Sequence, residues 1–212
     1  TWRKRPVPTH FTFKIFSAMA ALETGVIADK STVIAWDGVQ RSRTETNRDL
    51  DLQSAFRLSS VPHFQQLVKS VGAERMQGFI DAVGYGNRDI SGGIDRFWLT
   101  GGLRVSPRQQ VDFLVRLYRN ELPFSEQSMT AVKEMMVTEE GDGYVLRAKT
   151  GWATLENLDN TGWWAGWVET TDDVFFFTSL LHANAPAESF GPARQSVVRE
   201  SLIQLGILQA PL

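Results

Sequence analysis

The sequence predicts an α+β fold in which helices flank an antiparallel sheet. Apolar residues recur at helical spacing up to about residue 138, strand-like runs follow from about residue 142, and a helical segment closes the chain. The runs at 163–164 and 175–177 are apolar on consecutive residues, as in strands covered on both faces. We expect a single domain over residues 1–212, with a helical part at about 12–138 and the sheet with its terminal helix at about 142–208.

Helices are expected where residues at helical apolar spacing are bounded by residues that typically begin or end a helix. Gly25 is placed to end the first helix, Pro62 suits a first turn, and Ser106 precedes Pro107 as an N-cap. Residues 26–57 are mixed and polar and predict a loop-rich excursion. Helices are expected over 12–23, from about Pro62 to Gly72, over 73–83, and after Ser106 and Ser125.

Beyond Gly141 the pattern predicts an antiparallel meander and a covering helix. Strands are expected over 144–149, 163–169 and 174–181, separated by turn residues. The closing helix over 192–206 is expected to pack on this sheet through Val197, Val198, Leu202, Ile203 and Leu205. The methionines of the preceding segment, Met129, Met135 and Met136, are interpreted as helix core and not as a cofactor box.

Composition excludes several classes of function. The 22 basic and 24 acidic residues give a net charge of -2 and no basic stripe, which disfavours nucleic acid as a partner. The absence of cysteine removes a disulfide framework and a thiolate nucleophile, and it fits either redox compartment. Thr1 to Pro6 lack the apolar segment of a secretory signal, so a signal was either removed or never existed. No apolar run approaches the ~20 residues that span a bilayer.

Lys14 stands in the first turn of the first expected helix. A cation there opposes the helix dipole, which favours positive charge at the other end. Its neighbours Phe13, Ile15 and Phe16 are apolar, which favours burial over a lysine that extends to solvent. A lysine at this position therefore needs an explanation.

Four short motifs stand in an informative order, although each is weak alone. They are Phe11-Thr12-Phe13-Lys14, Ser59-Ser60-Val61, Tyr85-Gly86-Asn87 with Trp98 after it, and Lys149-Thr150-Gly151. Serine β-lactamases and penicillin-binding proteins carry Ser-x-x-Lys, a serine-containing triad and Lys-Thr-Gly in that order. The runs 21–25, 36–38, 91–99 and 163–169 extend the match, and the chain resembles class D (oxacillinase-type) β-lactamases from about Pro8 to Leu208.

The resemblance implies a site that hydrolyses the β-lactam amide through an acyl-serine. Lys14 matches the lysine that takes up carbon dioxide and serves as a carbamate base, which is the only cofactor-like group implied, and no metal is expected. Trp98 matches the indole that donates to that carbamate, Ser59 the serine that carries protons, and Val61 its apolar neighbour. A lysine that is buried and opposes the helix dipole would have a lowered pKa, and the uptake of carbon dioxide needs such a neutral amine.

The resemblance also implies the substrate contacts. Lys149, Thr150 and Gly151 would lie along the edge strand that pairs with the β-lactam, and Arg194 would bind its carboxylate through bidentate geometry. The backbone N–H groups of Phe11 and Trp152 would form the oxyanion hole.

Phe11 departs from the family, because it stands where the attacking serine belongs. A benzyl group cannot attack a carbonyl, and loss of the nucleophile in comparable hydrolases lowers the rate by about 10⁶. Thr12 is adjacent, but a helical rotation of about 100° directs its hydroxyl elsewhere. The segment between Pro8 and Lys14 also has one residue more than usual, and the N-terminal strands of the family are missing, which would leave the sheet short at one edge.

Four hypotheses follow. The first is a class D β-lactamase that Phe11 renders inactive or crippled, and the alternative is a non-catalytic β-lactam-binding or sensor-like pseudoenzyme. Phe11 could instead be an engineered or altered residue. A penicillin-binding transpeptidase is disfavoured, because Trp98 and the Tyr85-Gly86-Asn87 context belong to the lactamase branch. The resemblance implies a periplasmic or secreted location and leaves a homodimer open.

Overall fold

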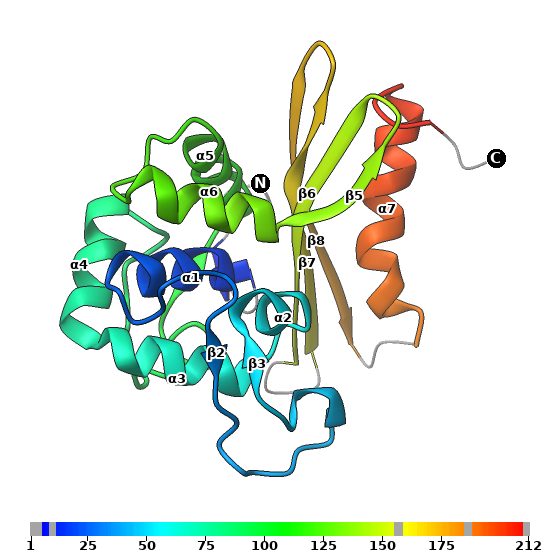
Figure 1. The fold of residues 1–212 in the computed structure, drawn as a ribbon. Coiled ribbons are helices and arrows are strands. Elements are labelled where there is room, and N and C mark those ends of the chain that lie inside the picture. Colours follow the sequence, from blue (N-terminus) through cyan, green and yellow to red (C-terminus); the bar gives the residue numbers. More distant parts are fainter. Residues whose placement is uncertain (1–5, 9–11, 155–158, 185–187, 210–212) are drawn as a thin grey trace.

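The computed structural model describes residues 6–8, 12–154, 159–184 and 188–209, and it places the helices and the sheet side by side (Figure 1). Most of the helices lie on one face of the sheet, and α7 lies on the other (Figure 1). The predicted α+β architecture is confirmed. Organisation as a single domain stays a prediction. Within the described residues no helix is both long and apolar enough to span a bilayer.

The helical part is built around α1, which packs against α3 and α6. Nine of its eleven residues are buried, because its sequence is rich in alanine and large apolar side chains. Gly25 follows it with φ +67, as the expected end of the helix requires. The helices of this part are α1 (Phe13–Glu23), α2 (Leu52–Arg57), α3 (Val61–Val71), α4 (Ala73–Val83), α5 (Pro107–Tyr118) and α6 (Glu126–Met135).

The expected helix starts are confirmed by their caps. Ser106 and Gln109 form a capping box at the start of α5, in which each side chain bonds to the other residue's backbone N–H. Ser125 accepts from the backbone N–H of Ser128 at the start of α6, and Glu23 accepts from both serine hydroxyls. The cap of α6 is thereby tied to the end of α1.

The main sheet is antiparallel in the order β5-β6-β7-β8. Its strands are β5 (Val137–Gly141), β6 (Tyr144–Thr154), β7 (Asp159–Thr170) and β8 (Val174–Asn184). The neighbours Trp163 and Trp164 are both buried, and they belong to the cores on the two opposite faces of the sheet. The consecutive apolar residues therefore indicate a doubly covered strand, as predicted.

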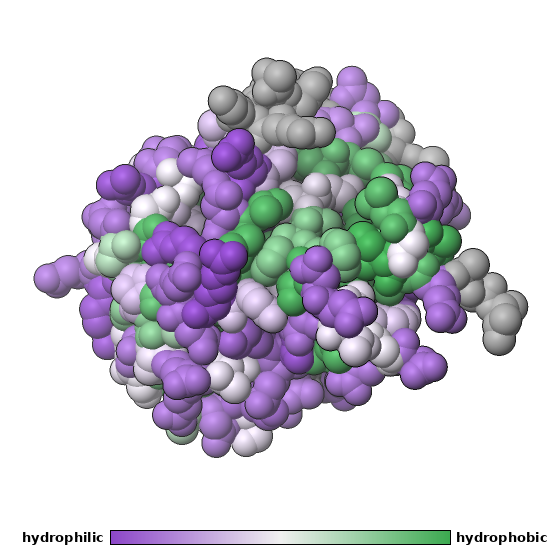
Figure 2. Space-filling view, turned by 90° about the horizontal axis from the view of Figure 1, so that it is seen from above, coloured by the Kyte–Doolittle hydropathy of each residue, from purple (hydrophilic) through white to green (hydrophobic). Residues whose placement is uncertain are grey.

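The closing helix α7 (Phe190–Gln204) covers one face of the sheet, but not through all the expected residues. Val198 and Leu202 are buried, whereas Val197 is 47% exposed and Leu205 is 73% exposed. A helix turns about 100° per residue, so Val197 cannot share the face of Val198, and Leu205 lies beyond the helix end. Apolar residues gather on one side of the face seen in Figure 2, while most of that surface is polar.

Two segments contain more regular structure than predicted. The expected loop-rich excursion over 26–57 contains β2 (Val33–Ile34), the 3-10 turn Thr44–Thr46, β3 (Leu50–Asp51) and α2. The missed start of α2 is Asp51, whose carboxylate accepts from the Ser54 backbone N–H at 2.6 Å. The sheet also begins earlier than about 142, because β5 precedes the predicted strands and its Val-Thr-Glu-Glu-Gly sequence lacks an apolar pattern.

A further small sheet lies where the chain approaches α1. It pairs β1 (Val7–Pro8) with β4 (Arg104–Val105), next to the Tyr85-Gly86-Asn87 turn. The indole Nε1 of Trp163 donates to the Pro8 carbonyl at 3.1 Å. The main sheet therefore holds the segment that leads toward position 11.

Candidate active site

Lys14 is fully buried in the first turn of α1. Its Nζ lies 5.4 Å from the centroid of the Phe64 ring, which α3 contributes. Burial, followed by the charges of Lys149 and Arg43, lowers the pKa of Lys14 well below its ordinary value. Burial therefore shifts this amine toward its neutral form.

Lys149 and Ser59 form the central contact of the site. Lys149 Nζ donates to Ser59 Oγ and lies 5.4 Å from the centroid of the Phe56 ring. Both residues are buried, at 4% and 8% exposed. Burial, with the charges of Arg194 and Arg43, lowers the pKa of Lys149 to about 7. The lysine and the hydroxyl thus form a buried hydrogen bond, and burial shifts the lysine toward its neutral form.

The two lysines reach one buried region from different layers. Lys14 comes from the central helix, Lys149 from the sheet, and Ser59 from the turn between α2 and α3. The positive charge of Lys149 lowers the pKa of Lys14, after the larger effect of burial. Lys149 therefore bonds to Ser59 and acts electrostatically on Lys14, although the three residues lie far apart in the sequence.

The Lys149-Thr150-Gly151 segment lies in β6, past the part that β5 covers. The β5–β6 register ends at Val137 and Arg147, and Ala148 then donates to the Met136 carbonyl. Beyond this point β7 is the only strand that pairs with β6 in the described chain. The prediction of an edge strand is therefore wrong for β6 as a whole, because β5 pairs with its first half. Its second half is nevertheless open on that side.

Arg194 reaches that edge from α7. Its Nη1 donates to the Gly151 carbonyl at 2.7 Å, and its guanidinium carbon lies 5.2 Å from the centroid of the Trp152 ring. Gly162 leaves room for it, because a Cβ there would lie 2.6 Å from Arg194 Cδ. Burial lowers the pKa of Arg194, which nevertheless stays a cation. Arg194 is therefore positioned by the sheet and is not a solvated residue at a helix end.

A cavity of about 540 Å³ adjoins Lys149 and Thr150. Phe56 and Gln53 of α2 line it on one side, and Gln195 of α7 lines it on another. The open edge of β6 thus faces space that a small molecule could fill. Val61, the predicted apolar neighbour, begins α3 two residues after Ser59 and is half-buried.

Trp98 is buried beside α1. Its ring stacks on Phe13, with centroids 5.6 Å apart, and meets Phe97 edge-on at 5.0 Å. Because Phe13 precedes Lys14, this packing places the indole next to the helix turn that carries the lysine. Core packing and a role near Lys14 are compatible.

The Tyr85-Gly86-Asn87 turn holds the scaffold together. The Tyr85 hydroxyl donates to Gln110 at 2.8 Å, and the Asn87 side chain bonds to the backbone of Gly102 and Arg104. A Cβ at Gly86 would lie 2.1 Å from the Arg104 carbonyl oxygen. The turn therefore fixes the β4 segment against α5.

Phe11, the predicted nucleophile position, lies outside the described residues, and so does its backbone N–H in the expected oxyanion hole. The other predicted site residues lie within them, as reported above. Within those residues no group of three or more His, Asp or Glu side chains is arranged to hold a metal ion.

Sequence reasoning missed Arg43, Phe56 and His63. Arg43 influences both lysines from the excursion that was expected to be irregular, and Phe56 comes from the unpredicted α2. The sequence did offer a sign of His63, because a histidine stands among apolar residues in the first turn of the helix predicted from about Pro62.

Comparison with known proteins places this geometry in a family. The model of the penicillin-binding protein transpeptidase domain matches residues 2–202. Beta-lactamase OXA-48 of Klebsiella pneumoniae is 42% identical over 197 residues, which cover 93% of this chain and 73% of the relative. The chain belongs to the class D β-lactamase family.

Other class D β-lactamases agree in sequence and in structure. Beta-lactamase OXA-10 of Pseudomonas aeruginosa is 43% identical over 199 residues, which cover 93% of this chain and 74% of the relative. The class D β-lactamase YbXI from Nostoc superposes with a TM-score of 0.92 at 42% identity, covering 98% of this chain and 86% of that structure. The family's fold thus extends over nearly all of this chain.

Proposed function

We propose that this class D family member recognises β-lactams along the open edge of β6, and that Phe11 abolishes or strongly reduces their hydrolysis. The observation that carries the proposal is the Lys149–Ser59 hydrogen bond beside buried Lys14. These are the groups that acyl transfer needs for moving protons. A purely structural site would not require two desolvated lysines, because burial of cations is unfavourable.

With a serine at position 11, the reaction would proceed in two steps. The serine oxygen would bond to the lactam carbonyl carbon while its proton passes to the base. The carbon–nitrogen bond would then break, and the ring nitrogen would receive that proton by relay. Water would then cleave the ester and release the ring-opened acid. In this scheme Ser59 and Lys149 deliver the proton to nitrogen, since they already share a hydrogen bond.

Lys14 is assigned to the base. Its lowered pKa favours the neutral amine, which is the form that adds carbon dioxide. The resulting carbamate would supply an acceptor for the serine proton and later for a proton of water. Trp98 is assigned to the support of this base, because it packs on the residue before Lys14.

The substrate contacts are assigned to the β6 edge. Thr150, Gly151 and Trp152 would pair with the ligand backbone, and Arg194 would attract its carboxylate. Val61 would be the apolar neighbour beside the Lys14 carbamate. We also propose a periplasmic or secreted location, as implied by the family, which cell fractionation of the natural host would test.

The test is hydrolysis of a chromogenic cephalosporin by the chain and by Phe11→Ser, both with added bicarbonate. We expect turnover only from Phe11→Ser, with a rate above the parent by about 10⁶ if the nucleophile alone is missing. Equal turnover by both proteins would disprove the assignment of position 11. No turnover by either would contradict the proposal of an otherwise intact hydrolase.

A second candidate is a β-lactam-binding protein without turnover. It is favoured by the presence of Lys149, Ser59 and Arg194 in a chain that carries phenylalanine at position 11. Calorimetric titration with a penicillin, followed by mass spectrometry of the intact protein, distinguishes the two. Saturable binding without an adduct supports the binding protein, and sequencing the source gene establishes whether Phe11 is natural.

A further inference from the structure

Ser59 adopts a backbone conformation that is unfavourable for a residue with a side chain. Its φ is +53, in the left-handed region. It lies in the short turn between α2 and α3, where its N–H donates to the Phe56 carbonyl at 3.1 Å. Such a conformation persists only where the surroundings hold it.

Ser60, the next residue, makes an unusual contact. It stands at the N-cap of α3, yet its side chain makes no capping hydrogen bond. Ser60 Oγ instead lies 2.7 Å from Nδ1 of His63, one helical turn further along. Both residues are completely buried. A serine that omits the usual cap in favour of a buried ring indicates that this contact has a role of its own.

The direction of the hydrogen bonds follows from the second ring nitrogen. His63 Nε2 lies 3.0 Å from the Arg48 carbonyl oxygen, which can only accept. The proton is therefore on Nε2, Nδ1 accepts, and the Ser60 hydroxyl donates. Burial lowers the pKa of His63 and thus favours this neutral ring. A directed chain runs from Ser60 through His63 to the backbone at Arg48.

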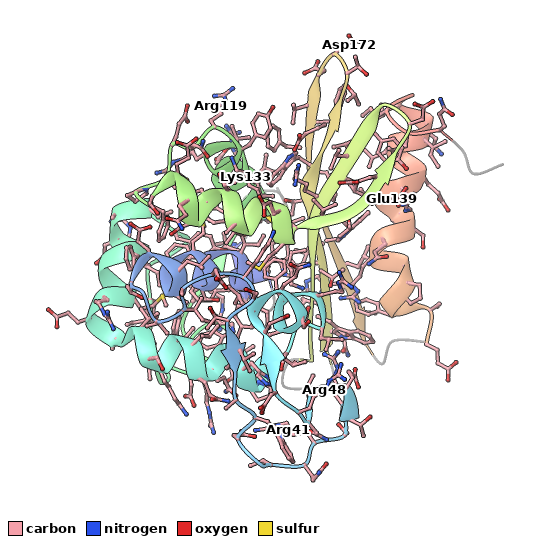
Figure 3. The ribbon with its side chains drawn as sticks, in the orientation of Figure 1. Arg41, Arg48, Arg119, Lys133, Glu139 and Asp172 are labelled. Atoms are coloured by element: carbon pink, nitrogen blue, oxygen red, sulfur yellow. The ribbon has the colours of Figure 1, made fainter. Side chains whose placement is uncertain are left out.

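Arg48 belongs to the excursion between β2 and β3, which also carries Arg41 (Figure 3). The same excursion holds the turn at a second point, because Arg43 Nη2 donates to the Leu58 carbonyl at 2.9 Å. The Ser60 N–H donates to the Ala55 carbonyl at 2.9 Å. The residues on either side of Ser59 are therefore fixed from α2, α3 and the excursion.

We propose that His63 is a positioning residue that acts through Ser60 to hold Ser59 in the conformation that meets Lys149. The proposal rests on the proposed function, in which Ser59 moves the proton to the leaving nitrogen. The histidine does not touch the reacting atoms. Its two ring nitrogens join the residue next to Ser59 to the backbone carbonyl of Arg48, and this link sets the direction of the Ser59 hydroxyl.

The chain permits a matched pair of substitutions. In His63→Asn the amide oxygen lies near the position of Nδ1 and can accept from Ser60, although the Arg48 contact is lost. In His63→Gln the amide reaches the Arg48 carbonyl, but no acceptor remains for Ser60. Ser60→Ala removes the link itself. Gln66→Ala is the control, because it removes a hydrogen bond from the same helix to the Ala35 carbonyl, away from Ser59.

In the Phe11→Ser background we expect Ser60→Ala and His63→Gln to lower kcat by up to about 10²-fold with little change in KM, since small displacements of reacting groups have effects of this size. His63→Asn should recover most of that loss, and Gln66→Ala should match the parent. Equal kcat for Ser60→Ala, His63→Gln and the parent, measured well below every Tm, would overturn the proposal. A merely structural histidine would lower Tm alone.

A second readout does not need turnover and therefore separates this inference from the proposed function. The Lys149 pKa can be followed by NMR in the chain with Phe11 intact. We expect titration near 7 in the parent and in His63→Asn, and a lower pKa in His63→Gln and Ser60→Ala, because the ammonium loses a well-placed acceptor. An unchanged Lys149 pKa in all variants would refute the positioning role even if Phe11→Ser is inactive.

Discussion

Lys149 Nζ donates to Ser59 Oγ across a sequence separation of 90 residues. This contact joins the sheet to the turn between α2 and α3, and it connects the two residues assigned to proton delivery. The backbone of Ser59 lies in the left-handed region, which is unfavourable for serine. The contacts of the surrounding turn must therefore hold this conformation. The contact can be tested without catalysis.

Ser59→Ala should lower the pKa of Lys149 below its value of about 7. The charged amine loses an acceptor, whereas its burial is unchanged, so the neutral form gains. NMR titration of the lysine side chains measures this directly. Ser70→Ala, at the exposed end of α3, should leave the titration in place. A raised Lys149 pKa in Ser59→Ala would contradict the assigned contact.

The free energy of unfolding should rise between about pH 7 and about pH 9. The folded-state pKa of Lys149 is about 7 and its ordinary value is 10.5, so in this window the unfolded chain binds a proton that the folded chain lacks. Stability therefore increases with pH, by up to ~1.4 kcal/mol per pH unit for each such group. Lys14 acts in the same direction.

Urea denaturation at several pH values measures this slope, and Lys149→Met should reduce it by one titrating group. The range from about pH 7 to about pH 9 lies below the pKa of about 10 at which Tyr85 would ionise in the unfolded chain. Burial raises the pKa of Tyr85, so its contribution would decrease stability at higher pH. A slope that Lys149→Met leaves unchanged would count against a depressed pKa for this lysine.

Much of the site could be predicted from the sequence because its motifs are local. Lys14 is marked by a cation in the first turn of an apolar helix, and Lys149-Thr150-Gly151 is contiguous. Arg43 and His63 could not be predicted in the same way. Arg43 bonds to another element, and His63 does so as well besides its local contact with Ser60. The hydrogen bond from Arg43 to Leu58 spans 15 residues, as does the contact from His63 to Arg48.

The fold shows the same division. The Ser106 and Ser125 caps were predictable, since each bonds within three residues of itself. The strand β5 was not, because its Val-Thr-Glu-Glu-Gly sequence has little strand propensity and is held by pairing with β6. The prediction that Val197 packs on the sheet was wrong, because the sequence of α7 has no sharply defined apolar face.

Trp163→Phe should lower the free energy of unfolding by about 2–4 kcal/mol. The change leaves the Pro8 carbonyl without its buried donor and opens space in the core. Urea denaturation measures the effect. Trp36→Phe is the control, because its indole bonds to the Val39 carbonyl at the surface, and it should cost under about 1 kcal/mol. Equal effects of the two changes would contradict a specific anchor at Pro8.

Lys14 should bind carbon dioxide even with Phe11 in place. The uptake depends on the neutral amine, which burial favours, and not on a nucleophile at position 11. Carbon-13 NMR with labelled bicarbonate should show a carbamate signal that vanishes in Lys14→Met. The exposed Lys69 is a control, since Lys69→Met should leave the signal unchanged. A signal that survives in Lys14→Met would assign the carbamate elsewhere.

Gly162→Ala should weaken the binding of ligands that carry a carboxylate. The added Cβ would lie 2.6 Å from Arg194 Cδ and 2.7 Å from Cγ, so the arginine must leave its place against the Gly151 carbonyl. A displaced charged hydrogen bond is worth about 1.5–3 kcal/mol, which corresponds to a roughly 10- to 100-fold higher Kd. Calorimetric titration with a penicillin measures the change.

The double variant with Arg194→Ala decides whether Gly162 acts through the arginine. Arg194→Ala removes the side chain that the new Cβ would displace, so adding Gly162→Ala should change Kd little further. Additive losses would instead show that Gly162→Ala disturbs the sheet, for example through Phe190, whose ring would lie 3.0 Å from the new Cβ. Non-additivity would therefore tie the ligand affinity to the position of Arg194 along β6.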